Sequence, residues 1–420
     1  MLKLRILISF LFLNFSFLIF NSVSAQPASP ADRDSSRLRI SLLTCTPGEE
    51  LYSTFGHSAF RVIDSNAVTD IVYNYGTFNF DDDGFYLKFV RGKLLYYVST
   101  EYFSSFRDFY QSENRGMTEQ VLNLSASEKI NIRRFLNENS KEENKYYKYD
   151  FFFDNCTTRL RDILKKQHDS SFTFRPVMPA GTTFRDAIYE YLDKNDKHWS
   201  KLGIDILLGL PCDGVMTAEQ MQFLPDNLMK SLDSANHPLV LSHQELYSIQ
   251  EEKNNTSFFT PLTVFSLLFG FIFLIGFVKN KFIQGLLQGF DGLFFFLTGA
   301  LGIVLIFMWT ATDHQMCKNN LNLLWAWPTH AFASFLVSSQ KAWVKKYFRF
   351  TAIALTLVLI SWFFLPQQMN TGLIPIVLLL IYRSAVKAFA TNDTNLPGGR
   401  QVKTNLIFRK FVSIRAIKEH

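Results

Sequence analysis

The pattern of apolar residues divides the chain into two halves. Residues 26–255 mix apolar positions with charged, aromatic and turn residues, whereas long apolar runs dominate from Phe258 onward. The run Phe258–Val278 has no charged residue over 21 positions, enough for a helix that spans a bilayer. Four more apolar runs follow, at Leu293–Thr310, Leu321–Ser338, Phe350–Leu365 and Leu373–Ala385. We therefore predict a transmembrane bundle of about five helices over residues 256–390, with four spans as the alternative.

Basic residues near these runs predict their orientation. They cluster after the first run, between the third and fourth, and after the last, at Lys279, Lys281, Lys341, Lys345, Lys346, Arg349, Arg383 and Lys387. Positive residues are enriched in cytoplasmic loops, so this pattern places the first half of the chain outside and residues 391–420 in a basic cytoplasmic tail. The net charge of +6 is explained by membrane topology, and we expect no nucleic-acid partner.

The N-terminus has the features of a secretory signal. Lys3 and Arg5 precede the apolar stretch Ile6–Phe20, and the small residues Ser22–Ala25 form a cleavage site. We predict a signal peptide over residues 1–25, the alternative being an uncleaved anchor. Either way, residues 26–255 form an exported domain.

Within this domain, alternating apolar positions predict strands at 38–45, 57–63, 70–75, 93–102 and 116–124. Helical spacing predicts helices at 104–113 and 127–139, and a further helix over Cys156–Gln167. Strands come first and helices later, so the expected fold class is α+β.

The segment FFFDNCTTRL places Cys156 at the start of a predicted helix, after the capping residues Asp154 and Asn155. The helix dipole and the unpaired N–H groups of a first turn stabilise a thiolate and lower the pKa of the thiol. The same N–H groups can hold an oxyanion. Cys156 is therefore a candidate nucleophile, although a buried inert cysteine or a disulfide is also compatible with the sequence. Cys45, at the end of a strand, is the second candidate and could also pair with Cys156.

A thiol nucleophile needs a base, and His57 is the best candidate because it follows Gly56 at the head of a strand. Pairing the strands about a turn between Ser65 and Asn66 places His57 opposite Asn74, whose amide could orient the imidazole. A shift of register by one residue would substitute Tyr73 or Tyr75.

Other polar residues are candidates for substrate binding. Arg159 lies on the same helical face as Cys156 and could bind a phosphate or a carboxylate, or form a structural ion pair. Asp313, His314 and His330 lie at the outer ends of predicted spans, where ionisable groups are often functional, although they could also be interfacial anchors. We see no phosphate loop, zinc pattern or serine elbow, so we expect no cofactor and no metal ion.

Several segments resemble a known family. LLTCTPGEELYSTFGHSAFRV, IVYNYGTFNF, YDFFFDNCTTRLRDIL, ILLGLPCDG and TDHQMCKNNLNLLWAWPTH are similar to the Bacteroides-type lipoprotein N-acyltransferases (Lnb). The order of histidine before cysteine also resembles the permuted papain-like fold of LRAT-like acyltransferases. The resemblance implies a permuted papain-like cysteine-acyltransferase domain, followed by an α-helical transmembrane bundle. It also implies a multi-pass protein of the bacterial inner membrane with residues 26–255 in the periplasm.

The resemblance further implies transfer of a fatty acyl group from a lipid ester to the α-amino group of the lipidated N-terminal cysteine of a lipoprotein. Diacylated lipoproteins and phospholipids would be the partners, Cys156 the nucleophile and His57 the base. The role of Asn74 rests on the strand pairing alone. The alternatives are a membrane-tethered thiol hydrolase, either a lipid esterase or a cysteine peptidase, and a non-enzymatic envelope scaffold.

Overall fold

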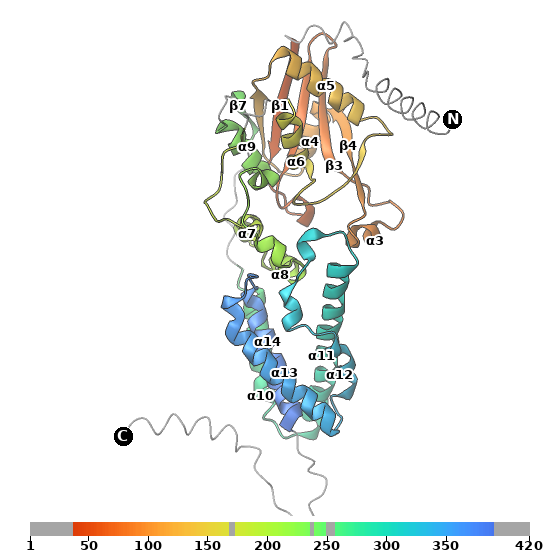
Figure 1. Cartoon of the computed structure of the whole chain (residues 1–420), viewed down its shortest axis with the longest axis vertical. Coiled ribbons are helices and arrows are strands. Elements are labelled where there is room, and N and C mark those ends of the chain that lie inside the picture. Colours follow the sequence, from red (N-terminus) through yellow and green to blue (C-terminus); the bar gives the residue numbers. More distant parts are fainter. Residues whose placement is uncertain (1–36, 168–172, 236–238, 249–256, 390–420) are drawn as a thin grey trace, which may run out of the picture. The chain divides into compact units, whose positions relative to one another are not determined.

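The computed structural model describes residues 37–167, 173–235, 239–248 and 257–389. The predicted signal peptide, the predicted cytoplasmic tail and the predicted domain boundary at 255/256 lie outside these ranges. The chain divides into two compact units, shown in Figure 1. The first unit contains the chain up to Lys201, together with Pro211–Thr256 and Ala311–Gln315. The second unit contains Leu202–Leu210, Ser257–Thr310 and the residues from Met316 onward. Each unit therefore includes short segments from the other half of the chain, whereas the sequence predicted one boundary near residue 255.

The first unit is built on a seven-stranded antiparallel sheet of order β6-β4-β3-β2-β1-β5-β7. The strands are β1 Leu38–Cys45, β2 His57–Asp64, β3 Thr69–Thr77, β4 Leu95–Tyr102, β5 Met117–Leu122, β6 Tyr146–Lys148 and β7 Val240–Tyr247. The five predicted strands are present, whereas β6 and β7 were missed. β7 lies at an edge of the sheet and is mostly exposed, so its sequence lacks the alternation that marks a half-buried strand.

The described residues of this unit form seven α-helices, of which α5, α6 and α9 cover one face of the sheet and α4 the other. These seven helices are α3 Phe85–Val90, α4 Phe103–Ser112, α5 Ala126–Asn139, α6 Cys156–Lys165, α7 Phe184–Lys194, α8 His198–Leu207 and α9 Pro225–Asp233, of which α8 continues into the second unit. One face packs Ile40, Phe60 and Tyr75 against apolar residues of α5, α6 and α9. The opposite face packs Cys45 and Ala59 against α4. This two-sided packing confirms an α+β domain.

The second unit is helical, with α10 Pro261–Ile275, α11 Lys281–Thr310, α12 Thr329–Ala333, α13 Ala342–Ser361 and α14 Ile374–Phe389. Among the described residues three helices are long and apolar enough to cross a membrane: Lys281–Thr310, Ala342–Phe364 and Thr371–Phe389. α10 is apolar but shorter.

The predicted third span, Leu321–Ser338, is not a continuous helix. It consists of two short 3-10 turns on either side of α12, with Pro328 preceding α12. Proline removes a backbone donor, and irregular backbone in a membrane is tolerated only where protein covers it. Helix α11 covers this segment closely because two of its residues are glycines. A Cβ on Gly299 would overlap the backbone of Ala331, and a Cβ on Gly302 would overlap the backbone of Ala326. Hydropathy alone could not reveal this break.

Candidate active site

The start of α6 is fixed by Asn155, which is buried. Its Oδ1 accepts a hydrogen bond from the N–H of Thr158 at 2.8 Å, and the Thr158 Oγ1 accepts one from the N–H of Asn155 at 2.8 Å. The Asn155 Nδ2 also donates to the carbonyls of Phe151 and Phe223. This capping box leaves Cys156 as the first residue of the helix, as predicted, where its N–H has no partner within the helix.

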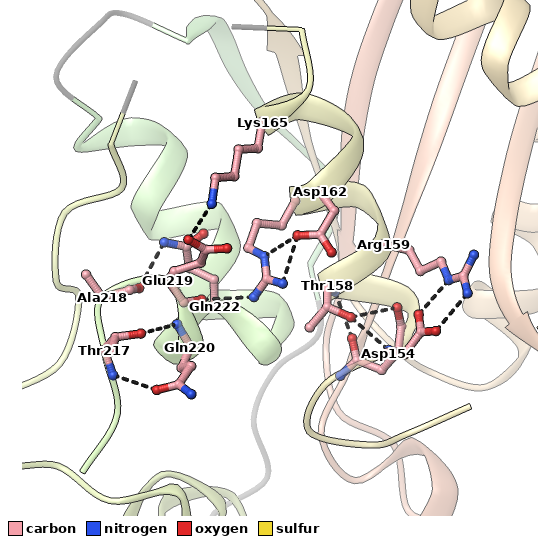
Figure 2. Close-up of polar contacts among 12 residues, drawn as sticks. Asp154, Thr158, Arg159, Asp162, Lys165, Thr217, Ala218, Glu219, Gln220 and Gln222 are labelled. Atoms are coloured by element: carbon pink, nitrogen blue, oxygen red, sulfur yellow. Dashed lines mark hydrogen bonds and ion pairs between the residues drawn. The ribbon is translucent and has the colours of Figure 1, made fainter. Parts of the chain in front are cut away.

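Charged side chains anchor the rest of α6 (Figure 2). Arg159 forms two hydrogen bonds to the carboxylate of Asp154, at 2.6 and 2.7 Å, and its guanidinium lies 3.7 Å from the ring centroid of Tyr147. Farther along, Lys165 pairs with Glu219 at 2.6 Å. The structure therefore shows Arg159 in an ion pair, one of the two roles that the sequence allowed, with its charge taken up by a carboxylate.

His57, the first residue of β2, lies beside Asn74 of β3. Its Nε2 donates a hydrogen bond to the Asn74 Oδ1, with the two atoms 2.7 Å apart. The predicted register is nevertheless wrong: Phe60 pairs with Tyr73, so the same register extended to His57 places it opposite Gly76, two residues beyond Asn74. Asn74 is a diagonal neighbour on the same face, close enough for the bond.

The register shifted because the turn is longer than predicted. Asp64 accepts hydrogen bonds from the N–H groups of Asn66 and Ala67, and the next paired residue is Thr69. An Asp side chain commonly caps a turn in this way. The shift of two residues keeps every side chain on its original face, which is why the contact survives the error.

Two glycines give the site its geometry. Gly76 has a φ of +91°, and a Cβ there would lie 3.5 Å from the Cβ of Cys156 and 3.9 Å from the Cε1 of His57. The thiol from α6 and the imidazole from β2 therefore meet beside a residue without a side chain. Gly56 has a φ of +78°, and a Cβ there would lie 2.8 Å from the carbonyl oxygen of Cys45. Both positions require a conformation that glycine adopts at little cost.

The thiol and the imidazole shift each other's pKa. Partial burial would raise the pKa of the Cys156 thiol, but the charge of His57 and its hydrogen bond, helped by the backbone of Ser58 and the hydroxyl of Thr157, lower it to about 7. Burial lowers the pKa of His57, but Cys156 and Asn74 outweigh it and raise the pKa overall. Both directions favour a thiolate–imidazolium pair at neutral pH. Cys156, His57 and Asn74 are all partly exposed, so a substrate can reach them.

Cys45 lies directly opposite His57 across β1 and β2, but it has a different environment. It is fully buried, and this burial raises the pKa of its thiol to about 12 despite the nearby Arg115. All four cysteines are free thiols, so the disulfide that the sequence left open is absent. Of the two candidate thiols, only Cys156 combines exposure with a lowered pKa.

Sequence reasoning missed two residues around His57. Tyr110 of α4 stacks on the imidazole, with ring centroids 6.3 Å apart. Glu101 of β4 lies on the same face as Asn74 and forms a side-chain hydrogen bond to it; burial raises the pKa of Glu101, while Asn74 and His57 lower it. Both come from strands or helices whose pairing the sequence alone did not specify.

The predicted binding residues of the second half have three different settings. Asp313 pairs with Lys148 at 2.5 Å, and His314 Nε2 forms a hydrogen bond with the carbonyl of Phe89 at 3.0 Å, both within the first unit. His330 is fully buried in the helical unit, where its Nδ1 lies 2.6 Å from the hydroxyl of Tyr347. Asp313 and His314 thus belong to the first unit and His330 to the second.

Comparison with known families accounts for both units. A family model described as the Lnb N-terminal periplasmic domain matches residues 25–190, and one described as the Lnb transmembrane domain matches residues 253–395. The chain belongs to the Lnb family. The comparisons with curated proteins and with solved structures find no match.

The Lnb match fixes the location of the two parts. The first is a periplasmic N-terminal domain, and the second is a multi-span transmembrane domain. Membership of the Lnb family implies an acyltransferase and suggests a role in lipoprotein N-acylation. Cys156, His57 and Asn74 all lie within the matched periplasmic domain.

Proposed function

We propose that this Lnb protein is a lipoprotein N-acyltransferase that uses Cys156 as nucleophile and His57 as general acid and base. The observation that carries the proposal is the partly exposed thiol of Cys156 at the start of α6. This thiol is hydrogen-bonded to His57, and its pKa is lowered to about 7. The Lnb family supplies the substrate class, a lipoprotein that accepts an acyl group on its N-terminal amine.

The first half-reaction forms a thioester. The thiolate of Cys156 attacks the acyl carbonyl carbon of a lipid ester, and the oxyanion is held by the first-turn N–H groups of α6. The carbon–oxygen bond then breaks, and the imidazolium of His57 protonates the departing alkoxide. Because the Nε2 of His57 is bonded to Asn74, the ring nitrogen that exchanges the proton is Nδ1.

The second half-reaction transfers the acyl group to nitrogen. The α-amino group of the lipidated cysteine attacks the thioester carbonyl, and neutral His57 accepts the proton that the amine releases. The carbon–sulfur bond breaks, which yields the amide and regenerates the Cys156 thiolate. A thioester reacts with amines more readily than an oxygen ester does, so the covalent step divides a slow aminolysis into two faster ones.

Asn74 completes the proposed site as a positioning residue. Its Oδ1 holds the Nε2–H tautomer, so Nδ1 faces the thiol with its lone pair. A cysteine at a helix start, a histidine on an antiparallel strand and an asparagine on the second ring nitrogen form the constellation of papain-like enzymes. This supports the permuted papain-like fold as part of the proposal.

Mass spectrometry of lipoprotein N-termini tests the proposal. Cells that carry the wild-type protein should show N-acylated lipoproteins, and Cys156→Ser should abolish the modification while the protein stays at its normal level in the membrane. Cys45→Ser is the matched control, because Cys45 faces His57 from the neighbouring strand. Retained acylation in Cys156→Ser together with loss in Cys45→Ser would show that the other thiol reacts. Hydrolysis of the ester without N-acylation would identify a thiol hydrolase instead.

A further inference from the structure

The connection between β3 and β4 exposes an unusual amount of apolar surface. Its short helix α3 turns Phe85 into the core of the sheet. Leu94 is also buried and Phe78 packs partly against the same core, whereas five other large apolar side chains face outward, with exposed fractions of 42–76%. They are Phe80, Tyr86, Leu87, Phe89 and Val90. A soluble domain rarely gathers this many exposed apolar side chains on one short loop unless the loop has a partner.

This connection lies at the same end of the sheet as the proposed site. β3 and β4 are antiparallel, and Gly76 near the end of β3 borders both Cys156 and His57. A series of ring contacts leads back from the loop: Phe80 to Phe78 at 4.9 Å, Phe78 to Tyr96 at 5.2 Å, and Tyr96 to Tyr149 at 4.1 Å. Tyr149 and Cys156 pack against the same core.

The segment that follows α11 in the chain contacts this loop. The N–H of Asp313 donates to the carbonyl of Arg91 at 3.1 Å, and His314 bonds to the carbonyl of Phe89. Asp313 lies three residues beyond the end of α11 at Thr310, and α11 is long and apolar enough to cross a membrane. The residues that contact α3 therefore follow a candidate membrane span directly in the sequence.

We propose that α3 inserts its exposed apolar side chains into the outer leaflet of the membrane and so delivers the lipid ester to Cys156. The inference rests on the proposed function for the delivery step, but not for the insertion. The loop has three acidic and three basic residues, Asp81, Asp82, Asp83, Lys88, Arg91 and Lys93. Their charges balance, so insertion depends on apolar contact and does not require anionic lipid.

Photocrosslinking tests the insertion directly. The full chain is reconstituted in phosphatidylcholine vesicles with labelled acyl chains, with p-benzoylphenylalanine in place of Tyr86 or of Phe89. Val68 is the matched control position, because it is 89% exposed at the turn between β2 and β3, at the other end of the sheet. We expect lipid adducts at the two α3 positions to exceed those at Val68 about tenfold or more. Equal lipid labelling at all three positions, or adducts to polypeptide alone, would overturn the proposal.

A second measurement tests the delivery step. Leu87→Asp should lower acyl transfer from a bilayer-held ester about tenfold more than it lowers turnover of a water-soluble ester, whereas Val68→Asp should affect neither. Equal losses on the two esters would contradict delivery by α3. If Cys156 is not the nucleophile, Cys156→Ser leaves the turnover of both esters unchanged, while the crosslinks still report insertion. The two failures can therefore be told apart.

Discussion

The paired ionisable groups of the two units differ in their surroundings and in their partners. In the periplasmic unit, the thiol of Cys156 and the imidazole of His57 share one proton. The pair is therefore either a thiol beside a neutral imidazole or a thiolate beside an imidazolium. In the membrane unit, Asp291 lies between Arg383 at 2.6 Å and Lys387 at 2.7 Å, and its carboxylate is fully buried. Arg383 forms two hydrogen bonds to this carboxylate, so the second group is a buried ion pair.

The Cys156–His57 pair is suited to reactivity, whereas the ion pair of Asp291 stabilises the fold. A thiol whose pKa is lowered beside an imidazole whose pKa is raised can take part in proton transfer, whereas a carboxylate bound to a guanidinium by two hydrogen bonds only joins two helices. The buried ion pair connects α11 and α14, and its geometry leaves the carboxylate no oxygen without a cation. Arg383 and Lys387, which the sequence analysis used as basic flanking charges of the last span, thus also form this ion pair.

The largest effect is expected for His57→Gln. Glutamine keeps hydrogen-bonding groups but cannot carry a proton, so acyl transfer should fall about 10²–10⁴-fold. The pKa of Cys156 should rise, because the charge of His57 is what lowers it to about 7. Alkylation by iodoacetamide across a pH series measures this directly. The wild-type rate should increase as pH rises through about 7, and the midpoint in the variant should lie at higher pH. An unchanged midpoint would remove His57 from the site.

Asp291→Asn should reduce stability more than any other single change in the membrane unit. It leaves Arg383 and Lys387 without a counter-charge in an apolar interior, which costs about 3–5 kcal/mol. Unfolding of the purified chain in detergent measures the loss. Asp108→Asn is the matched control, since its ion pair with Arg107 is exposed and contributes at most about 1 kcal/mol.

The folded fraction of Asp291→Asn should still react with iodoacetamide at the wild-type rate, because its role is structural. If its stability equalled that of Asp108→Asn, the ion pair would not hold the membrane helices together.

A smaller effect is expected for Asn74→Ala. Without the Oδ1 acceptor the imidazole can rotate or change tautomer, and misplacement of this kind lowers kcat about a hundredfold. Asn74→Asp keeps an acceptor at the same position and should recover part of the loss. A KM close to that of the wild type would distinguish positioning from substrate binding. Equal activity in Asn74→Ala and the wild type would show that the hydrogen bond has no catalytic role.

The sequence by itself determined most of the local structure around the site. The largely apolar run Leu38–Cys45, bounded by the turn signal Thr46-Pro47-Gly48, predicted β1, and the pair Asp154-Asn155 located the start of α6. These features depend on residues close together in the chain, such as the capping box of Asn155 and Thr158. Cys156 and His57 could be proposed as candidate site residues for the same reason.

Only the tertiary structure decided which distant groups meet. The length of the turn after Asp64 set the register that brings Gly76, rather than Asn74, opposite His57. The break at Pro328 depends on the glycines of α11, and the ion pair of Asp291 depends on α14 lying beside α11. The register follows from a local turn that is longer than predicted, whereas the break and the ion pair are set by packing between segments far apart in the chain, about which local periodicity carries no information.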